Sequence, residues 1–192
     1  MPRHKEFDAD AAVDKAMQVF WTHGYANTTP QRLVDELGIG RGSLYNAFGS
    51  KRELYERALR RYYERETARL IEVLDGPGDA RGRLRAALRV VIAASLGDRD
   101  RRGCLMTNAA IELTADDELV AHLVRRAFDR QHAAFFSTVA EGVAMKEFGA
   151  ETDCAAVASL LLATINGIRV LARVDPSPAR LDALADTALR VL

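Results

Sequence analysis

Apolar residues recur at helical spacing along nearly the whole chain, and no segment alternates apolar and polar residues with a period of two. This pattern predicts an all-α fold of about nine helices. With the capping residues, glycines and prolines that delimit each segment, it predicts helices over residues 8–23, 29–37, 41–48, 50–74, 79–96, 103–113, 116–146, 151–174 and 178–191. Thr114 is the N-cap expected for the helix over 116–146.

Two short helical patterns separated by a glycine turn lie between Thr29 and Phe48. Thr29 is suited to cap the first helix, and Pro30 follows in the first helical position, where its missing N–H group costs nothing. Gly38 follows the last apolar residue of that helix and suits the left-handed conformation of a helix C-terminus. Ile39 is then expected inside the turn. Two helices joined in this way predict a helix-turn-helix, which places its second helix in the major groove of DNA.

The second helix of the motif is expected to bury Leu44 and Phe48, which are four residues apart. The side chains left to point outward are Arg41, Ser43, Tyr45 and Asn46. Arginine can fork onto guanine, asparagine can pair with adenine, and serine or tyrosine can hold phosphate oxygens. Ser50 and Glu53 form the pattern of a capping box, in which each side chain satisfies a backbone donor of the other residue. Lys51, beside the free N–H groups of this helix, is expected to contact phosphate.

Several short motifs occur together between Gly24 and Leu54. They are the Gly38-Ile39 turn, the run Gly42-Ser43-Leu44-Tyr45, Phe48, and the run Ser50-Lys51-Arg52-Glu53-Leu54. In this combination the segment resembles the DNA-binding domain of the TetR family of bacterial repressors. The chain departs from that family at Gly40, where many members have a Ser or Thr cap, and at Ala47, where many have a histidine that meets the phosphate backbone.

The resemblance implies two domains. An N-terminal helix-turn-helix domain of three helices, residues 1–50 and here called the reading head, is joined by a long fourth helix to a larger helical domain. That second domain, residues 51–192, is expected to bind an effector and to form the dimer. By the same resemblance, the DNA contacts fall on Thr29, Gln31, Arg41, Ser43, Tyr45, Asn46 and Lys51.

The net charge of the chain argues against a nucleic-acid partner. The 192 residues carry 27 Lys and Arg and 27 Asp and Glu, for a net charge of zero, whereas DNA-binding domains are commonly basic. The segment 25–52 is more favourable because its basic residues outnumber its acidic ones, and Arg3, His4 and Lys5 add a basic arm. One reading head therefore has few phosphate contacts, and two subunits should be needed for useful affinity at physiological salt.

Composition also limits the compartment and the chemistry. No apolar signal region follows residues 3–5, and the longest apolar-leaning stretch, 154–165, is too short to span a bilayer. Two cysteines in a chain of this length argue against a disulfide framework. We expect a cytoplasmic protein without a membrane segment. The four histidines lack metal-ligand spacing and no catalytic or nucleotide-binding motif occurs, so we expect no metal, no cofactor and no catalytic residues.

The last two predicted helices are the candidate dimer surface. The helix over 151–174 is apolar nearly all round, with alanine, serine and glycine among leucine and isoleucine. Such a helix must be buried, and its small residues allow a partner backbone to approach closely. Together with the helix over 178–191, it can close the protomer's own core or form half of a four-helix dimer interface. The family resemblance favours the homodimer, because two-fold symmetry matches a palindromic operator.

A small-molecule effector is expected to bind between the helices of the second domain. Asn108 and His132 are polar groups in an apolar helical context that a ligand could satisfy, although backbone groups or water do so more often. Phe128 and Cys104 complete the candidate pocket. Cys104 follows Arg101-Arg102-Gly103 at an expected helix start, where guanidinium groups and the helix dipole favour an accessible thiolate. It is either a sensor of electrophiles or oxidants, as in similar TetR-like regulators, or a small buried hydrophobe.

These features predict a homodimeric transcriptional regulator. It is expected to be a repressor that binds a palindromic double-stranded operator and is released when an effector shifts the helix over 50–74, which is about 35 Å long. The alternative is a helical ligand-binding or partner-binding module that retains a helix-turn-helix without binding an operator. An enzyme is the hypothesis with least support.

Overall fold

The computed structural model describes residues 8–113 and 117–192. Over these ranges the chain forms nine α-helices, a 3-10 turn at Leu189–Val191 and no strand. The helices are α1 (Ala9–His23), α2 (Pro30–Leu37), α3 (Arg41–Phe48), α4 (Lys51–Leu74), α5 (Ala80–Gly97), α6 (Leu105–Glu112), α7 (Glu118–Ala144), α8 (Cys154–Val174) and α9 (Pro178–Ala188).

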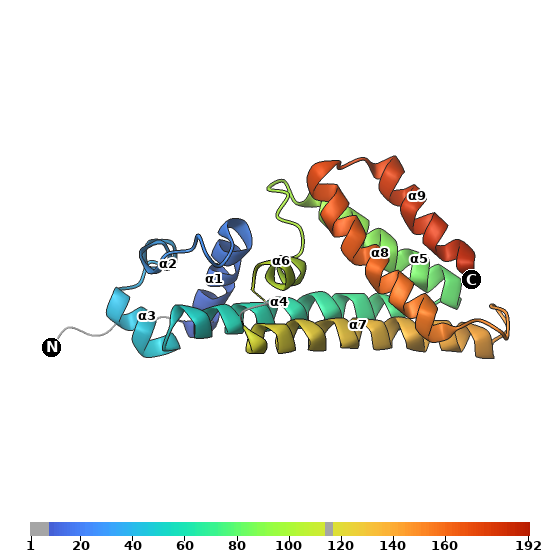
Figure 1. Cartoon of the computed structure of the whole chain (residues 1–192), viewed down its shortest axis with the longest axis horizontal. Helices are drawn as coiled ribbons and strands as arrows, with labels where there is room; N and C mark the ends of the chain where they lie inside the picture. Colours follow the sequence, from blue (N-terminus) through green and yellow to red (C-terminus); the bar gives the residue numbers. More distant parts are fainter. Residues whose placement is uncertain (1–7, 114–116) are drawn as a thin grey trace.

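Helices α4 and α7 lie side by side along the length of the molecule (Figure 1). The first three helices gather at the end where α4 begins, and α5, α8 and α9 gather toward its other end. The short helix α6 lies between these two groups. With 24 residues, α4 spans about 36 Å at 1.5 Å per residue, which makes it long enough to connect them.

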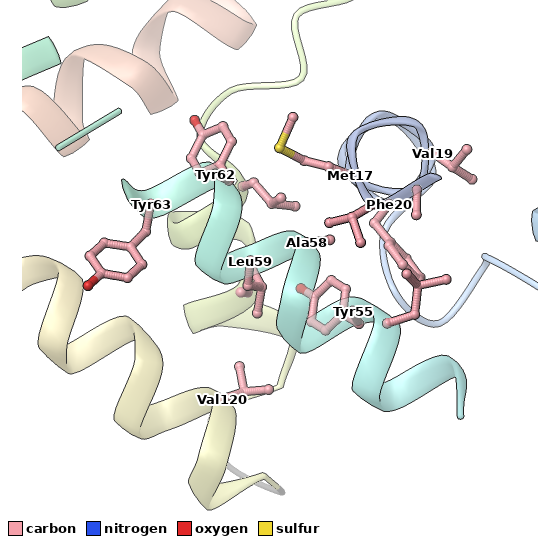
Figure 2. Packing of buried hydrophobic residues seen from close by; sticks show 14 of the residues in the cluster. Met17, Val19, Phe20, Tyr55, Ala58, Leu59, Tyr62, Tyr63 and Val120 are labelled. Atoms are coloured by element: carbon pink, nitrogen blue, oxygen red, sulfur yellow. The ribbon is translucent and has the colours of Figure 1, made fainter. Parts of the chain in front are cut away.

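Two hydrophobic cores divide α4 between them. The head core joins α1 to α3, the first half of α4, α6 and the beginning of α7. At its centre the rings of Phe20 and Tyr55 meet edge to face with centroids 4.9 Å apart, and Figure 2 shows Tyr55 and Tyr62 on the side of α4 toward α1. The body core joins the end of α4, through Leu70 and Leu74, to α5, α7, α8 and α9. We call α5 to α9 the body.

The sequence pattern placed every helix boundary within three residues of its position in the structure. The helix predicted from 103 begins at 105 because Gly103 has a φ of 72°, outside the helical region, and Cys104 occupies the N-cap position. The helix predicted to reach 191 ends at Ala188 and tightens into the 3-10 turn. Thr114, the expected cap of α7, lies outside the described residues. Asp117 caps α7, and its side chain accepts hydrogen bonds from the backbone N–H groups of Leu119 and Val120 in the first turn.

Helix α8 continues past the apolar stretch 154–165 that the sequence singled out. Among the described residues it is the one helix long and apolar enough, by length and composition, to cross a membrane. In this fold it packs against α5, α7 and α9, and Arg169 within it is buried. Its apolar surface therefore belongs partly to the body core.

Candidate nucleic-acid interface and effector cavity

The helix-turn-helix forms as the sequence predicts. Thr29 caps α2 by accepting a hydrogen bond from a backbone N–H of the first turn at 3.1 Å. Gly38 ends α2 in the left-handed conformation with a φ of 68°, and Ile39 packs partly buried against the head core. Gly40 precedes α3 and provides no side-chain cap. The buried apolar residues of the two helices are Leu33, Leu37, Leu44 and Phe48.

Six of the residues expected to contact DNA lie on two short neighbouring helices. They occupy exposed or half-buried positions, Thr29 and Gln31 at the start of α2 and Arg41, Ser43, Tyr45 and Asn46 on α3. The Arg41 guanidinium lies 5.9 Å from the centre of the Tyr45 ring. Gln31 donates a hydrogen bond to Asp35 at 2.8 Å. The side-chain types that read guanine and adenine are thus brought together on α3; their contacts with bases stay a prediction.

The predicted capping box at the start of α4 forms only in part. The Ser50 hydroxyl accepts a hydrogen bond from the Glu53 N–H at 3.1 Å, as expected. The Ser50 N–H, however, donates to the Phe48 carbonyl at 2.9 Å, because Gly49 turns the chain sharply with a φ of 75°. The Glu53 carboxylate therefore accepts from the Ser50 hydroxyl at 3.2 Å instead of from the backbone.

Lys51 lies in the first turn of α4, close to the turn that follows α1. Its ammonium is 4.1 Å from the centre of the Tyr25 ring, a cation–π contact that holds the side chain in place. Burial lowers the pKa of Lys51, and the nearby Glu112 opposes this shift. A phosphate oxygen beside the ammonium would favour its charged form in the same way. The position therefore suits the phosphate contact that the sequence predicted.

Polar contacts beside α4 also join the reading head to the body. Glu112, the last residue of α6, accepts hydrogen bonds from the backbone N–H groups of Tyr25 at 3.2 Å and Ala26 at 2.8 Å. The Trp21 indole donates to the Gly103 carbonyl at 3.0 Å. The Trp21 indole fixes the end of α1 against the segment before α6. The Glu112 carboxylate fixes the turn after α1 against α6.

Arg102 provides a second connection at the same boundary. Its guanidinium lies 4.0 Å from the centre of the Trp21 ring and donates to Gln18 at 2.8 Å and to Asp98 at 3.0 Å. Trp21 is half-buried at this boundary, where its ring meets that of Tyr62 with centroids 5.0 Å apart. Nothing in the sequence pairs residues more than eighty positions apart.

The polar residues expected in the effector pocket are satisfied within the protomer. Asn108 donates to the Arg102 carbonyl at 2.9 Å and accepts from Arg173 at 3.1 Å. His132 Nε2 lies 3.3 Å from a backbone carbonyl oxygen and 3.2 Å from a hydroxyl oxygen of α8. Phe128 packs half-buried against the head core. The structure does not bring these three side chains together around one cavity.

Cys104 stands at the start of α6, as expected, but the residue is only 3% exposed. This burial corrects the expectation of an accessible thiolate. A guanidinium does lie beside the thiol, with Nη1 of Arg169 3.7 Å from Sγ. It comes from α8 rather than from the preceding Arg101 or Arg102. The sequence could not find this neighbour because α8 is remote along the chain.

A cavity of about 320 Å³ lies where the reading head meets the body. Its walls come from α1, α4, α5, α8 and the segment between α5 and α6, and Trp21 and Arg169 are among the lining residues. The volume is at the small end of the range for ligand sites. None of the four predicted effector residues lines it, although Cys104 and Asn108 contact arginines that do.

Comparison with known proteins decides the family. Residues 12–58 match the family described as bacterial regulatory proteins, tetR family, and residues 80–188 match the tetracyclin repressor-like C-terminal domain. The chain belongs to the TetR family. The family predicted from residues 24–54 and the all-α fold with an N-terminal helix-turn-helix are both confirmed.

Relatives of this TetR-family protein match it over almost their whole length. YezE of Bacillus subtilis strain 168, an uncharacterized HTH-type transcriptional regulator, is 31% identical over 193 residues, which cover 100% of each chain. The HTH-type transcriptional repressor ComR of Escherichia coli K12 is 30% identical over 98% of this chain and 90% of ComR. A solved structure of CifR, a cysteine mutant of a TetR-family regulator complexed with 26-bp double-strand operator DNA, has a TM-score of 0.87 and 33% identity over 98% of each chain. The protein is a transcriptional regulator.

Glu112 offers a direct test of the contact between α6 and the reading head. Glu112→Ala removes the acceptor of the Tyr25 and Ala26 N–H groups, so their amide hydrogen exchange should accelerate several-fold. Glu72→Ala is the matched control, because Glu72 is an exposed residue in the second half of α4. Unchanged exchange at both amides in Glu112→Ala would show that the carboxylate does not hold this turn.

Proposed function

We propose that this TetR-family protein represses transcription by binding a palindromic operator as a homodimer in the cytoplasm, and that a small-molecule effector releases it. The observation that carries the operator-binding role is the outward polar face of α3 beside Lys51. The role of ComR as a repressor and the operator complex of CifR support the same function. The division into a reading head of residues 1–50 and an effector and dimerisation domain of residues 51–192 is part of this proposal.

Each side chain predicted to contact DNA has a role that follows from its chemistry. Arg41 forks onto guanine and Asn46 pairs with adenine in the major groove. Ser43, Tyr45 and Lys51 hold phosphate oxygens and fix the angle of α3. Thr29 and Gln31 lie at the N-terminus of α2, where free N–H groups and the helix dipole favour a phosphate. Ala47 supplies no anchor, so a single head binds weakly.

One face of α8 supports the homodimer. Small and apolar residues follow one another there at alternating spacings of four and three, which places them in one line along the helix. They are Ala156, Leu160, Ala163, Gly167, Val170 and Val174. All but the half-buried Gly167 are exposed in the protomer, Leu160 by 40% and Val174 by 82%. We call this line the α8 stripe. A second copy of α8, with α9 beside it, would cover it.

The cavity at the boundary supports control by an effector. A ligand there would touch the connecting helix α4, helices α5 and α8 of the body, and Trp21 of the reading head. Such a ligand can alter the orientation of the head and the separation of the two heads in a dimer. A differential affinity of a few kcal/mol between the two arrangements is sufficient for release.

Operator binding is tested with the DNA upstream of the protein's own gene. Arg41→Gln should weaken binding about tenfold or more and relax selectivity at particular base pairs, because it removes a bidentate base contact. Lys51→Gln should weaken binding to all sequences alike and should lower the salt dependence by about one phosphate contact per head. Fluorescence anisotropy at several salt concentrations measures both effects.

Lys146→Gln is the control for these variants. Lys146 lies in the turn after α7, at the end of the molecule away from α3, and should leave operator affinity unchanged. If Arg41→Gln and Lys51→Gln both bound DNA like the unaltered protein, the helix-turn-helix would not be the DNA-binding element and the chain would be a ligand-binding or partner-binding module.

The homodimer is tested on the α8 stripe. Ala163→Glu places a carboxylate in the middle of the stripe, where it would be buried without a partner at the proposed interface. We expect the variant to be a folded monomer by analytical ultracentrifugation and to lose most of its operator affinity. Ala68→Glu makes the same change at an exposed position of α4 and should remain dimeric. If Ala163→Glu remained dimeric, the dimer interface would not be at the α8 stripe.

Sensing through Cys104 is tested by release from DNA. Cys104→Ser should bind the operator normally but should no longer be released by N-ethylmaleimide or hydrogen peroxide, because it lacks the thiol that these reagents modify. Cys154→Ser controls for the other cysteine and should respond like the unaltered protein. Release that survives Cys104→Ser would make Cys104 a packing residue, in keeping with its burial.

A further inference from the structure

The cavity between the reading head and the body has an excess of positive groups. The whole chain has equal numbers of basic and acidic residues, but the cavity wall has five arginines and two carboxylates. The arginines are Arg69, Arg101, Arg102, Arg169 and Arg173, and the carboxylates are Glu66 and Asp98. A cleft lined mainly by one sign of charge concentrates ions of the other sign.

Part of this charge has no carboxylate nearby. Asp98 is engaged by Arg102 at 3.0 Å. Arg173 donates to the neutral amide of Asn108. In the part of the chain that the structure describes, neither Arg101 nor Arg173 has a carboxylate oxygen within 4.0 Å. Among the described residues, two cations at the wall are therefore without an ion pair.

The other carboxylate of the wall, that of Glu66, lies near two arginines. Glu66 lies 3.7 Å from Arg69 and 3.8 Å from Arg169, distances beyond the 2.7–2.9 Å of a charge-assisted hydrogen bond. Arg169 is 8% exposed, and its guanidinium also lies beside the Cys104 thiol. Burial opposes the charge of Arg169, but its neighbours Cys104, Tyr62 and Glu66 outweigh burial and raise its pKa. Arg169 is thus a buried cation without a short contact to an anion.

Part of the wall is apolar. Leu70 of α4, Val90, Val91 and Ala94 of α5, and the Trp21 ring line it. One small cavity therefore combines a surface that excludes water with guanidinium groups that attract an anion. A planar carboxylate matches a guanidinium through two parallel hydrogen bonds.

We propose that the effector of this regulator is a small amphipathic carboxylate. Its carboxylate would bind Arg169 and the arginines at the rim, and its apolar part would lie against Leu70, Val91 and Trp21. This inference rests on the proposed function, because it assigns a chemical class to the effector. It also provides a route to the reading head: a carboxylate that competes with Asp98 for Arg102 would disturb the contacts of Arg102 with Trp21 and Gln18.

The chain contains a natural reporter for this cavity. Trp21 is its one tryptophan and lies in the wall, so indole fluorescence responds to occupancy. The purified full-length protein is titrated with hexanoate, hexanamide and hexylamine, which share a tail and differ in charge. Hexanoate should produce a saturable change and bind about tenfold or more tightly than hexanamide. Equal or tighter binding of the amide or the amine, or no saturable change with hexanoate, would overturn the proposal.

Arginine variants identify the anion contact. Arg169→Gln should abolish the preference for hexanoate over hexanamide. Because Arg169 is buried, Arg101→Gln provides a second variant at an exposed rim position that should fold normally and lose several-fold in hexanoate affinity. Arg65→Gln, at an exposed position of α4 that does not line the cavity, is the control. Unchanged hexanoate binding by both cavity variants would overturn the proposal.

Operator binding without any carboxylate is measured on the same samples. Operator binding without hexanoate binding would refute the effector class alone. Hexanoate binding without operator binding would refute the repressor function and leave a carboxylate-binding module.

Discussion

The packing of α4 into two hydrophobic cores is the constraint on which the arrangement of this regulator depends. Tyr55 and Tyr62 belong to the head core, whereas Leu70 and Leu74 belong to the body core. Each such buried side chain contributes about 1.5–3 kcal/mol relative to exposure, so neither end of the helix can leave its core without a large loss. No residue of α4 is a glycine or proline that would favour a kink. The body therefore acts on the reading head through a rod that moves as a unit.

The orientation of the head about this rod depends on weaker contacts. Glu112, Gly103 and Arg102 hold the reading head through hydrogen bonds and a cation–π contact at a partly exposed boundary. Hydrogen bonds of this kind contribute about 0.5–1.5 kcal/mol each, and more where a charged group takes part. Their sum is comparable with the differential free energy that a ligand must supply to switch a regulator. Strong apolar packing thus keeps the two parts together, while a few polar contacts decide how they are turned.

Local signals in the sequence were sufficient for the helices and for the reading head. Thr29, Gly38 and the apolar spacing of Leu44 and Phe48 define the helix-turn-helix within twenty residues, because capping and turn conformations depend on neighbours along the chain. The same reasoning was incomplete at Ser50, where the φ of Gly49 diverted a backbone donor. The cavity could not be predicted from such local signals at all. Trp21, Arg102 and Arg169 come from three separate parts of the chain, and periodicity assigns each to a helix face or loop without pairing them.

The distribution of charge joins these observations. A chain with no net charge can bind DNA only where basic side chains are concentrated, and the reading head has few of them. In the proposed homodimer, two heads held at a fixed separation act together, so affinity would depend steeply on their geometry. Basic side chains are also concentrated around the cavity at the head–body boundary. Because one of these arginines, Arg102, lies over the Trp21 ring, an anion bound there would change the electrostatic balance at the contacts that orient the head. Under the proposed mechanism, a small rearrangement would then be sufficient for release, since losing the simultaneous engagement of both heads removes far more affinity than any single contact provides.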